Sequence, residues 1–151
     1  MSEVGAIVLA AVLVVCAAAA WWLRARNGAV RTEARPDADP GVLDALERLG
    51  ARPAEADLTV VQFSTAFCAP CRATRARLEH LQRRSPRLAV LHVDAEQHLD
   101  AVRELDVRRT PTLFYLDRDG GLIGRSSGAP RPEELTALVA AHAGTVTEGT
   151  T

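Results

Sequence analysis

Residues 58–71 read Leu-Thr-Val-Val-Gln-Phe-Ser-Thr-Ala-Phe-Cys-Ala-Pro-Cys. The first seven residues form a short apolar and β-branched run, which is typical of a buried strand. Cys68 and Cys71 come next, and an Ala- and Arg-rich segment then continues with helical periodicity to Arg84. The pattern therefore predicts two thiols at the junction of a strand and a helix.

The position and spacing of these thiols indicate disulfide chemistry. Cys68 would lie at the start of the helix, where unpaired backbone amides and the helix dipole stabilise a thiolate. Cys71 would lie one turn further on and could resolve a mixed disulfide formed at Cys68. Pro70 fits the first helical turn, because its missing amide donor is not needed there and its fixed φ stiffens the loop. We expect Cys68 to be the attacking thiol and Cys71 the resolving thiol.

The rest of the chain predicts alternating helices and strands. A short helix should begin at Pro40, capped by Asp39, and end before Gly50. After the motif helix we expect an α/β order, with strands at 88–93, 112–116 and 122–125, helices at 96–105 and 132–142, and a turn at 117–120.

From about residue 58 to residue 143 the chain resembles the thioredoxin family. The resemblance is carried by the strand ending at Phe63, the Cys-Ala-Pro-Cys motif, a strand closing on Val93-Asp94 and the run Arg-Arg-Thr-Pro-Thr at residues 108–112. It implies a thioredoxin fold, in which a mixed central sheet is flanked by helices, and a protein-disulfide reductase without a cofactor. It also implies a cis peptide bond before Pro111.

The resemblance further implies which residues meet the substrate and which partners take part. Substrate-binding residues would be Phe67, Ala69, Pro70, Thr110 and Pro111. The partners would be disulfide-containing proteins and, as electron donor, a thioredoxin reductase or a membrane protein. Whether the chain reduces or oxidises its substrates depends on a potential that the residues do not give.

The chain departs from thioredoxin proper at several positions. Phe67 stands where the family has tryptophan, and Thr110 where thioredoxin has isoleucine. Gln62 replaces the family's buried aspartate, and Val90 replaces the lysine that partners it. Because an amide cannot accept the proton of the resolving thiol, we expect resolution to be slower or to use water or another base.

The N-terminal part predicts a membrane anchor. Residues 4–23 contain no charged side chain and, as a helix, would reach ~30 Å, the thickness of a bilayer core. Only Glu3 precedes the run, whereas Arg24, Arg26, Arg31 and Arg35 follow it. This asymmetry predicts a single-pass protein of the cell membrane with a cytoplasmic domain. An extracytoplasmic domain and a cleaved signal peptide are the alternatives.

The predicted layout is an anchor at 1–23 in contact with the lipid bilayer, a linker at 24–39, a thioredoxin-like domain at 40–143 and a disordered tail at 144–151. The net charge of -1 argues against a nucleic-acid surface. Zinc is not expected, because a structural site needs four ligands and the soluble part has one cysteine pair. A binding module without catalysis, or a carrier of a soft metal, remains the alternative function.

Overall fold

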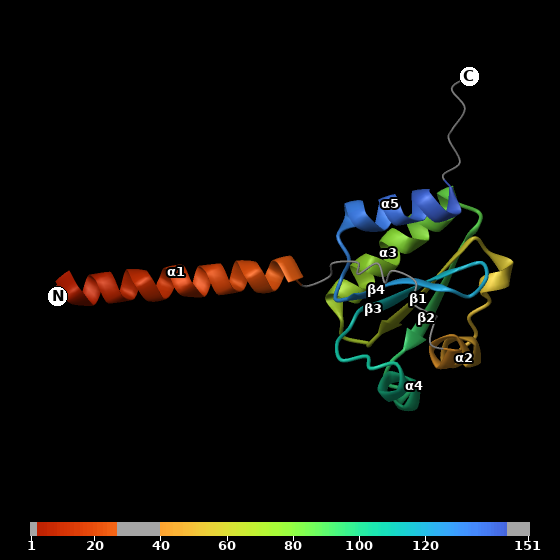
Figure 1. Ribbon diagram of the computed structural model, residues 1–151, viewed down its shortest axis with the longest axis horizontal. Coiled ribbons are helices and arrows are strands. Elements are labelled where there is room, and N and C mark those ends of the chain that lie inside the picture. Colours follow the sequence, from red (N-terminus) through yellow and green to blue (C-terminus); the bar gives the residue numbers. More distant parts are fainter. Residues whose placement is uncertain (1–2, 27–39, 145–151) are drawn as a thin grey trace, which may run out of the picture.

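The computed structural model describes residues 3–26 and 40–144 of the chain (Figure 1). The predicted cap Asp39, the linker residues 27–39 and the tail residues 145–151 lie outside the described residues. The elements are, in chain order, α1 (Glu3–Arg26), α2 (Pro40–Arg48), the 3-10 helix η1 (Pro53–Glu55), β1 (Leu58–Ser64), α3 (Ala69–Arg84), β2 (Leu88–Asp94), α4 (Leu99–Glu104), β3 (Thr112–Asp117), β4 (Leu122–Ser127) and α5 (Pro132–Ala143).

The four strands form one mixed sheet in the order β2-β1-β3-β4. Strand β1 is parallel to β2, which the chain reaches through α3, and antiparallel to β3. The register of the parallel pair sets Gln62 opposite His92. Strands β3 and β4 form a hairpin in which the carboxylate of Asp117 accepts hydrogen bonds from the amides of Asp119 and Gly121.

Successive residues of the strands supply two separate cores, because side chains alternate between the faces of a sheet. On one face Phe63 and Phe114 meet edge to face, 5.8 Å between ring centroids, in a cluster that includes Leu46 of α2. On the other face Tyr115 shares a cluster with Leu78 of α3, and the same cluster contains residues of α5. Figure 1 shows α3 and α5 on one side of the sheet and α2 and α4 on the other. The predicted mixed sheet flanked by helices is confirmed.

Most predicted elements agree with the structure to within two residues, and α4 is the exception. The sequence predicted a helix from residue 96, but α4 begins at Leu99. The carboxylate of Asp94 accepts hydrogen bonds from the amide of Glu96 and the side chain of Gln97, and the amide of Gln97 donates to the carbonyl of Asp94. These bonds close a turn after β2, so the helix can start only beyond it.

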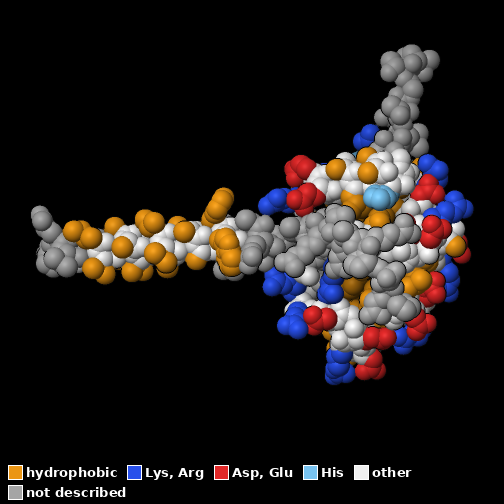
Figure 2. All heavy atoms as spheres, viewed as in Figure 1, with side chains coloured by type: hydrophobic (Ala, Val, Ile, Leu, Met, Phe, Trp, Pro, Cys, Tyr) orange, Lys and Arg blue, Asp and Glu red, His pale blue; other side chains and the backbone are white. Residues whose placement is uncertain are grey.

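Helix α1 corresponds to the predicted anchor and continues to Arg26. Its exposed apolar side chains include Ile7, Val14 and Trp21. Figure 2 shows hydrophobic side chains, in orange, on all visible sides of this helix. Nevertheless, none of the helices in the described part of the chain has the combination of length and apolar character that a membrane span requires.

The predicted localisation, a single-pass cell-membrane protein with a cytoplasmic domain, is therefore wrong, and the lipid bilayer is not supported as a partner. The prediction rested mainly on the absence of charge between residues 4 and 23.

Candidate functional site

Cys68 and Cys71 are joined by a disulfide at the start of α3, with their Cα atoms 5.2 Å apart. Cys68 is the N-cap residue of this helix, and its sulfur accepts a hydrogen bond from the amide of Cys71 at 3.2 Å. The same amide also donates to the carbonyl of Cys68. A helix start thus directs a backbone donor at the sulfur of Cys68, which favours negative charge on that atom.

The two sulfurs differ in their access to solvent. Cys68 is 9% exposed and Cys71 is 3% exposed. Cys71 lies in the first turn of α3 and is buried, as are Thr74 and Leu78 on the same helix. Cys68 is therefore the more accessible cysteine of the pair.

A second loop closes over the motif from the start of β3. The peptide bond between Thr110 and Pro111 is cis, as predicted. The Thr110 hydroxyl lies 3.5 Å from the hydroxyl of Thr65, whose carbonyl accepts a hydrogen bond from the amide of Cys68. The Pro111 carbonyl accepts a hydrogen bond from the amide of Gly128, a residue with a positive φ that favours glycine. These contacts hold the proline loop beside the cysteine motif.

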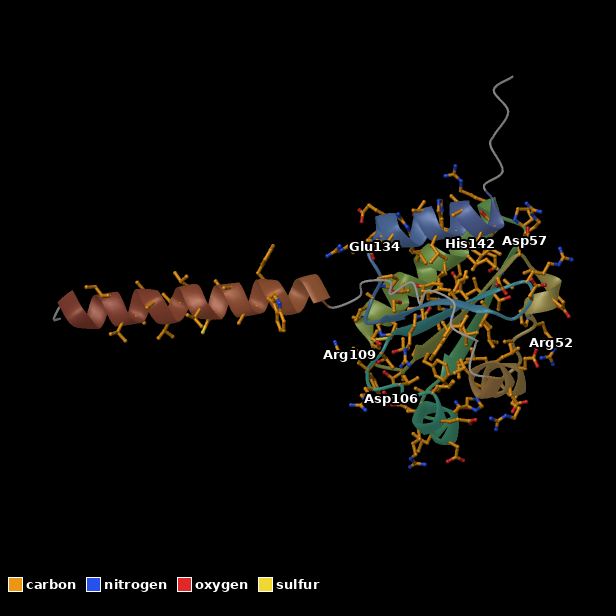
Figure 3. All side chains as sticks on the ribbon, viewed as in Figure 1. Arg52, Asp57, Asp106, Arg109, Glu134 and His142 are labelled. Atoms are coloured by element: carbon orange, nitrogen blue, oxygen red, sulfur yellow. A yellow bond between two sulfur atoms is a disulfide. The ribbon has the colours of Figure 1, made fainter. Side chains whose placement is uncertain are left out.

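The surface around this loop carries residues from several elements at one end of the sheet. Figure 3 places Arg109, next to the cis bond, and Glu134, at the start of α5, at this end of the domain. Asp57, which precedes β1, lies at the opposite end (Figure 3). The site therefore occupies the end of the sheet where β1 finishes and β3 begins.

The predicted substrate-binding residues fall on this surface. Phe67 is 97% exposed, and Ala69 and Pro70 are exposed beside it. Thr110 is half-buried and Pro111 is buried. An exposed aromatic ring next to a reactive sulfur offers apolar area to a protein substrate.

Gln62 lies behind the disulfide, at 1% exposure. Its Nε2 donates a hydrogen bond to the carbonyl of Cys71 at 3.0 Å, while its Oε1 has no partner among the described residues. A cavity of about 440 Å³ is lined by Gln62, Cys71 and His92, with further residues of β1, β2 and α3 around it. Within the described ranges, no three His, Cys, Asp or Glu side chains are grouped to hold a metal ion.

Two residues that belong to this site were not predicted. Thr65 links the cysteine motif to the proline loop, and His92 lines the cavity on the side of β2. The alternation of side chains along a strand could have assigned Gln62 and His92 each to one face of the sheet. Only the register between the two strands shows that these residues are neighbours.

The fold and the site together define a class of protein: a mixed sheet with helices on both faces, a Cys-X-X-Cys disulfide at a helix start, and a cis-proline loop linked to the motif through Thr65. The family model described as thioredoxin matches residues 51–141, which is more than half of the chain. The chain therefore belongs to the thioredoxin family, and the resemblance stated from the motifs is confirmed.

Curated relatives and solved structures agree with this assignment. The chain is similar to Thioredoxin H4-1 of Oryza sativa subsp. japonica, with 32% identity over 50% of this chain and 57% of the relative. It is similar to the H-type thioredoxin of Picea mariana, with 31% identity over 62% of this chain and 74% of the relative. The X-ray structure of Fasciola hepatica thioredoxin matches with a TM-score of 0.55 and 29% identity, over 64% of this chain and 90% of that one. The match to the rice protein thus spans little more than half of that relative.

Proposed function

We propose that this chain reduces protein disulfides with Cys68 as the attacking thiol and Cys71 as the resolving thiol. The observation that carries the proposal is the juxtaposition of the two sulfurs at the start of α3, with the greater exposure and the backbone donor both at Cys68. The family's chemistry supports the same assignment.

In the reduced protein, the Cys68 thiolate attacks one sulfur of a substrate disulfide, and the other substrate sulfur leaves as a thiolate. A mixed disulfide then joins Cys68 to the substrate. Cys71 loses its proton and attacks the Cys68 sulfur, which releases the second substrate thiol. Two electrons have passed to the substrate, and the protein holds the Cys68–Cys71 disulfide seen here. A disulfide reductase of the thioredoxin reductase type would return the two electrons.

The proline loop and the exposed ring would position the substrate. The backbone of Thr110, next to the cis bond, would pair with an extended segment of the substrate, while Phe67 would cover an apolar side chain. Ala69 and Pro70 lie on the same exposed rim and would leave room for the approaching sulfur.

The test is reduction of insulin disulfides by variants made in a Cys16→Ala background, because Cys16 is an exposed free thiol that would react with disulfide probes. Cys68→Ser should abolish turnover. Cys71→Ser should accumulate a mixed disulfide visible by mass spectrometry. Full turnover by Cys68→Ser would disprove the assignment, and stoichiometric copper in the purified protein would favour the carrier function.

A further inference from the structure

Two side chains that line the cavity beside Cys71 each carry a buried polar atom with no hydrogen-bond partner among the described residues. These atoms are Oε1 of Gln62 and Nδ1 of His92. The two residues are paired in the register of strands β1 and β2. Buried polar groups in folded proteins are almost always hydrogen-bonded to protein or to ordered water. The cavity of about 440 Å³ is lined by Gln62, His92 and Cys71, so it has room for water beside all three residues.

The residues that line this cavity leave few proton acceptors. Gln62 is an amide and cannot take a proton, and the guanidinium groups of Arg72 and Arg75 are already charged. Asp94 carries a carboxylate, but both of its oxygens accept hydrogen bonds from the turn after β2. His92 has a ring nitrogen with no such commitment.

We propose that His92 accepts the proton of the Cys71 thiol through water in this cavity, and so takes part in the resolving step. This inference rests on the proposed roles of Cys68 and Cys71. The proton leaves the Cys71 sulfur and passes through water to the imidazole, which becomes an imidazolium. The electron pair left on sulfur forms the bond to Cys68, and the substrate thiolate leaves. The imidazolium then returns the proton to solvent.

The surroundings of His92 keep its imidazole neutral at physiological pH. Burial lowers the pKa of His92 below its ordinary value, and the positive charge of Arg75 lowers it further. Glu79, which pairs with Arg75 on α3, opposes this effect. Arg72 and Asp94 are the other charged groups at the cavity. A neutral imidazole can accept a proton, whereas an imidazolium cannot.

The experiment separates attack from resolution in the reduced Cys16→Ala protein. Dithiobis(nitrobenzoic acid) releases one thionitrobenzoate when Cys68 attacks and a second when Cys71 resolves. His92→Gln should leave the first phase unchanged within about twofold and slow the second about tenfold or more at neutral pH. The matched control is His80→Gln, the same change at an exposed residue of α3, which should alter neither phase.

A second variant guards against an effect of altered packing. His92→Ala opens the cavity further, so added imidazole should restore the second phase in a concentration-dependent way and leave His80→Ala unaffected. In the wild type the second phase should slow further on acidification, at a lower pH than for an ordinary histidine because the pKa of His92 is lowered. This additional loss of rate should be absent from His92→Gln. A second phase that is unchanged in both His92 variants, or slowed without rescue by imidazole, would overturn the proposal. Loss of the first phase in the His92→Gln protein would also overturn the proposal. Absence of the first phase in the Cys16→Ala protein with His92 intact would instead disprove the role of Cys68.

Discussion

Nε2 of Gln62 donates a hydrogen bond to the main-chain oxygen of Cys71, 3.0 Å away. This bond ties the end of β1 to the first turn of α3, directly beneath the resolving sulfur. A carboxylate at the same position would have no proton to donate at neutral pH. The amide therefore holds the helix start in a way that an ionised acid could not.

Replacing this amide by an acid should make stability depend on pH. In Gln62→Glu, burial would raise the carboxyl pKa above its unfolded value of about 4.3. When the pKa of a group is higher in the folded than in the unfolded protein, its contribution to stability is complete below the unfolded-state pKa. That contribution is lost as pH rises through the folded-state pKa. We expect the variant to be at least about 2 kcal/mol less stable than the wild type near pH 8, and much closer to it near pH 4.

Urea unfolding of Gln62→Glu at the two pH values measures this effect. Gln82→Glu, at an exposed position of α3, is the matched control and should stay within about 0.5 kcal/mol of the wild type. Equal destabilisation of Gln62→Glu at both pH values would contradict the explanation.

Phe67 should act on substrate binding and not on stability. Its side chain is 97% exposed, so Phe67→Ser should change the free energy of unfolding by less than about 0.5 kcal/mol. Loss of apolar contact should raise the KM for insulin several-fold, by roughly 1 kcal/mol of binding, and leave the reaction with a small aromatic disulfide nearly unchanged. Leu99→Ser, an exposed apolar residue of α4, is the control and should leave both reactions unaltered. An unchanged KM for insulin would remove Phe67 from the substrate surface.

Tyr115 should make the fold sensitive to alkali. Burial raises the pKa of Tyr115 to about 12, although its hydrogen bond with Ser126 acts in the opposite direction. Its contribution to stability is complete below pH 10 and is lost as pH rises toward 12, by roughly 2 to 3 kcal/mol in total. The chain has no lysine and no other tyrosine, so few other groups titrate in this range.

Tyrosine absorbance and circular dichroism, followed together during an alkaline titration, test this prediction. The two signals should change in the same transition. Tyr115→Phe should be about 1 kcal/mol less stable near neutral pH, because Ser126 loses its partner, but should be free of this alkaline loss. Ionisation of Tyr115 at its ordinary pKa in a folded protein would contradict the buried hydroxyl.

Arg125 should not be replaceable by lysine. Its guanidinium donates to the carbonyls of Leu105 and Asp106, at 2.9 and 2.7 Å, and lies 4.8 Å from the ring centroid of Phe114. An ammonium group cannot make both bonds and keep a planar stack. We expect Arg125→Lys to lower the free energy of unfolding by about 1 to 2 kcal/mol. Arg103→Lys, which changes an exposed ion pair, should have almost no effect in the same urea experiment. Equal losses of unfolding free energy in the two variants would show that the paired hydrogen bonds of the Arg125 guanidinium do not contribute to stability.

Local patterns in the sequence predicted the core of the fold well. Strand β1 has the predicted bounds, and α3 begins directly after Cys68, because β-branched runs and helix-start signals act over a few residues. The cysteine pair could be placed because thiols at a helix start carry the chemistry themselves, whereas the cis bond at Pro111 was implied by the resemblance to the family. The bounds of α4 could not be predicted, since the Asp94 turn uses side-chain bonds that periodicity does not show.

The environment of the cysteines could be predicted only in part. The loss of the buried acid at Gln62 was evident, but the donor bond from Gln62 to Cys71 depends on how closely α3 approaches the sheet. His92 could not be predicted to lie near Cys71, because their proximity arises from strand register and not from spacing along the chain. Tertiary contacts of this kind lie beyond any local pattern.

Helix α2 precedes the region that matches the family model, which starts at residue 51. Leu46 nevertheless has no exposed surface and belongs to the same cluster as Phe63 and Phe114. A recombinant fragment that starts at the family boundary would expose those aromatic rings to solvent, and such a fragment would tend to self-associate. Anyone wishing to crystallise or label the redox domain in isolation should therefore retain the chain from Pro40 onward.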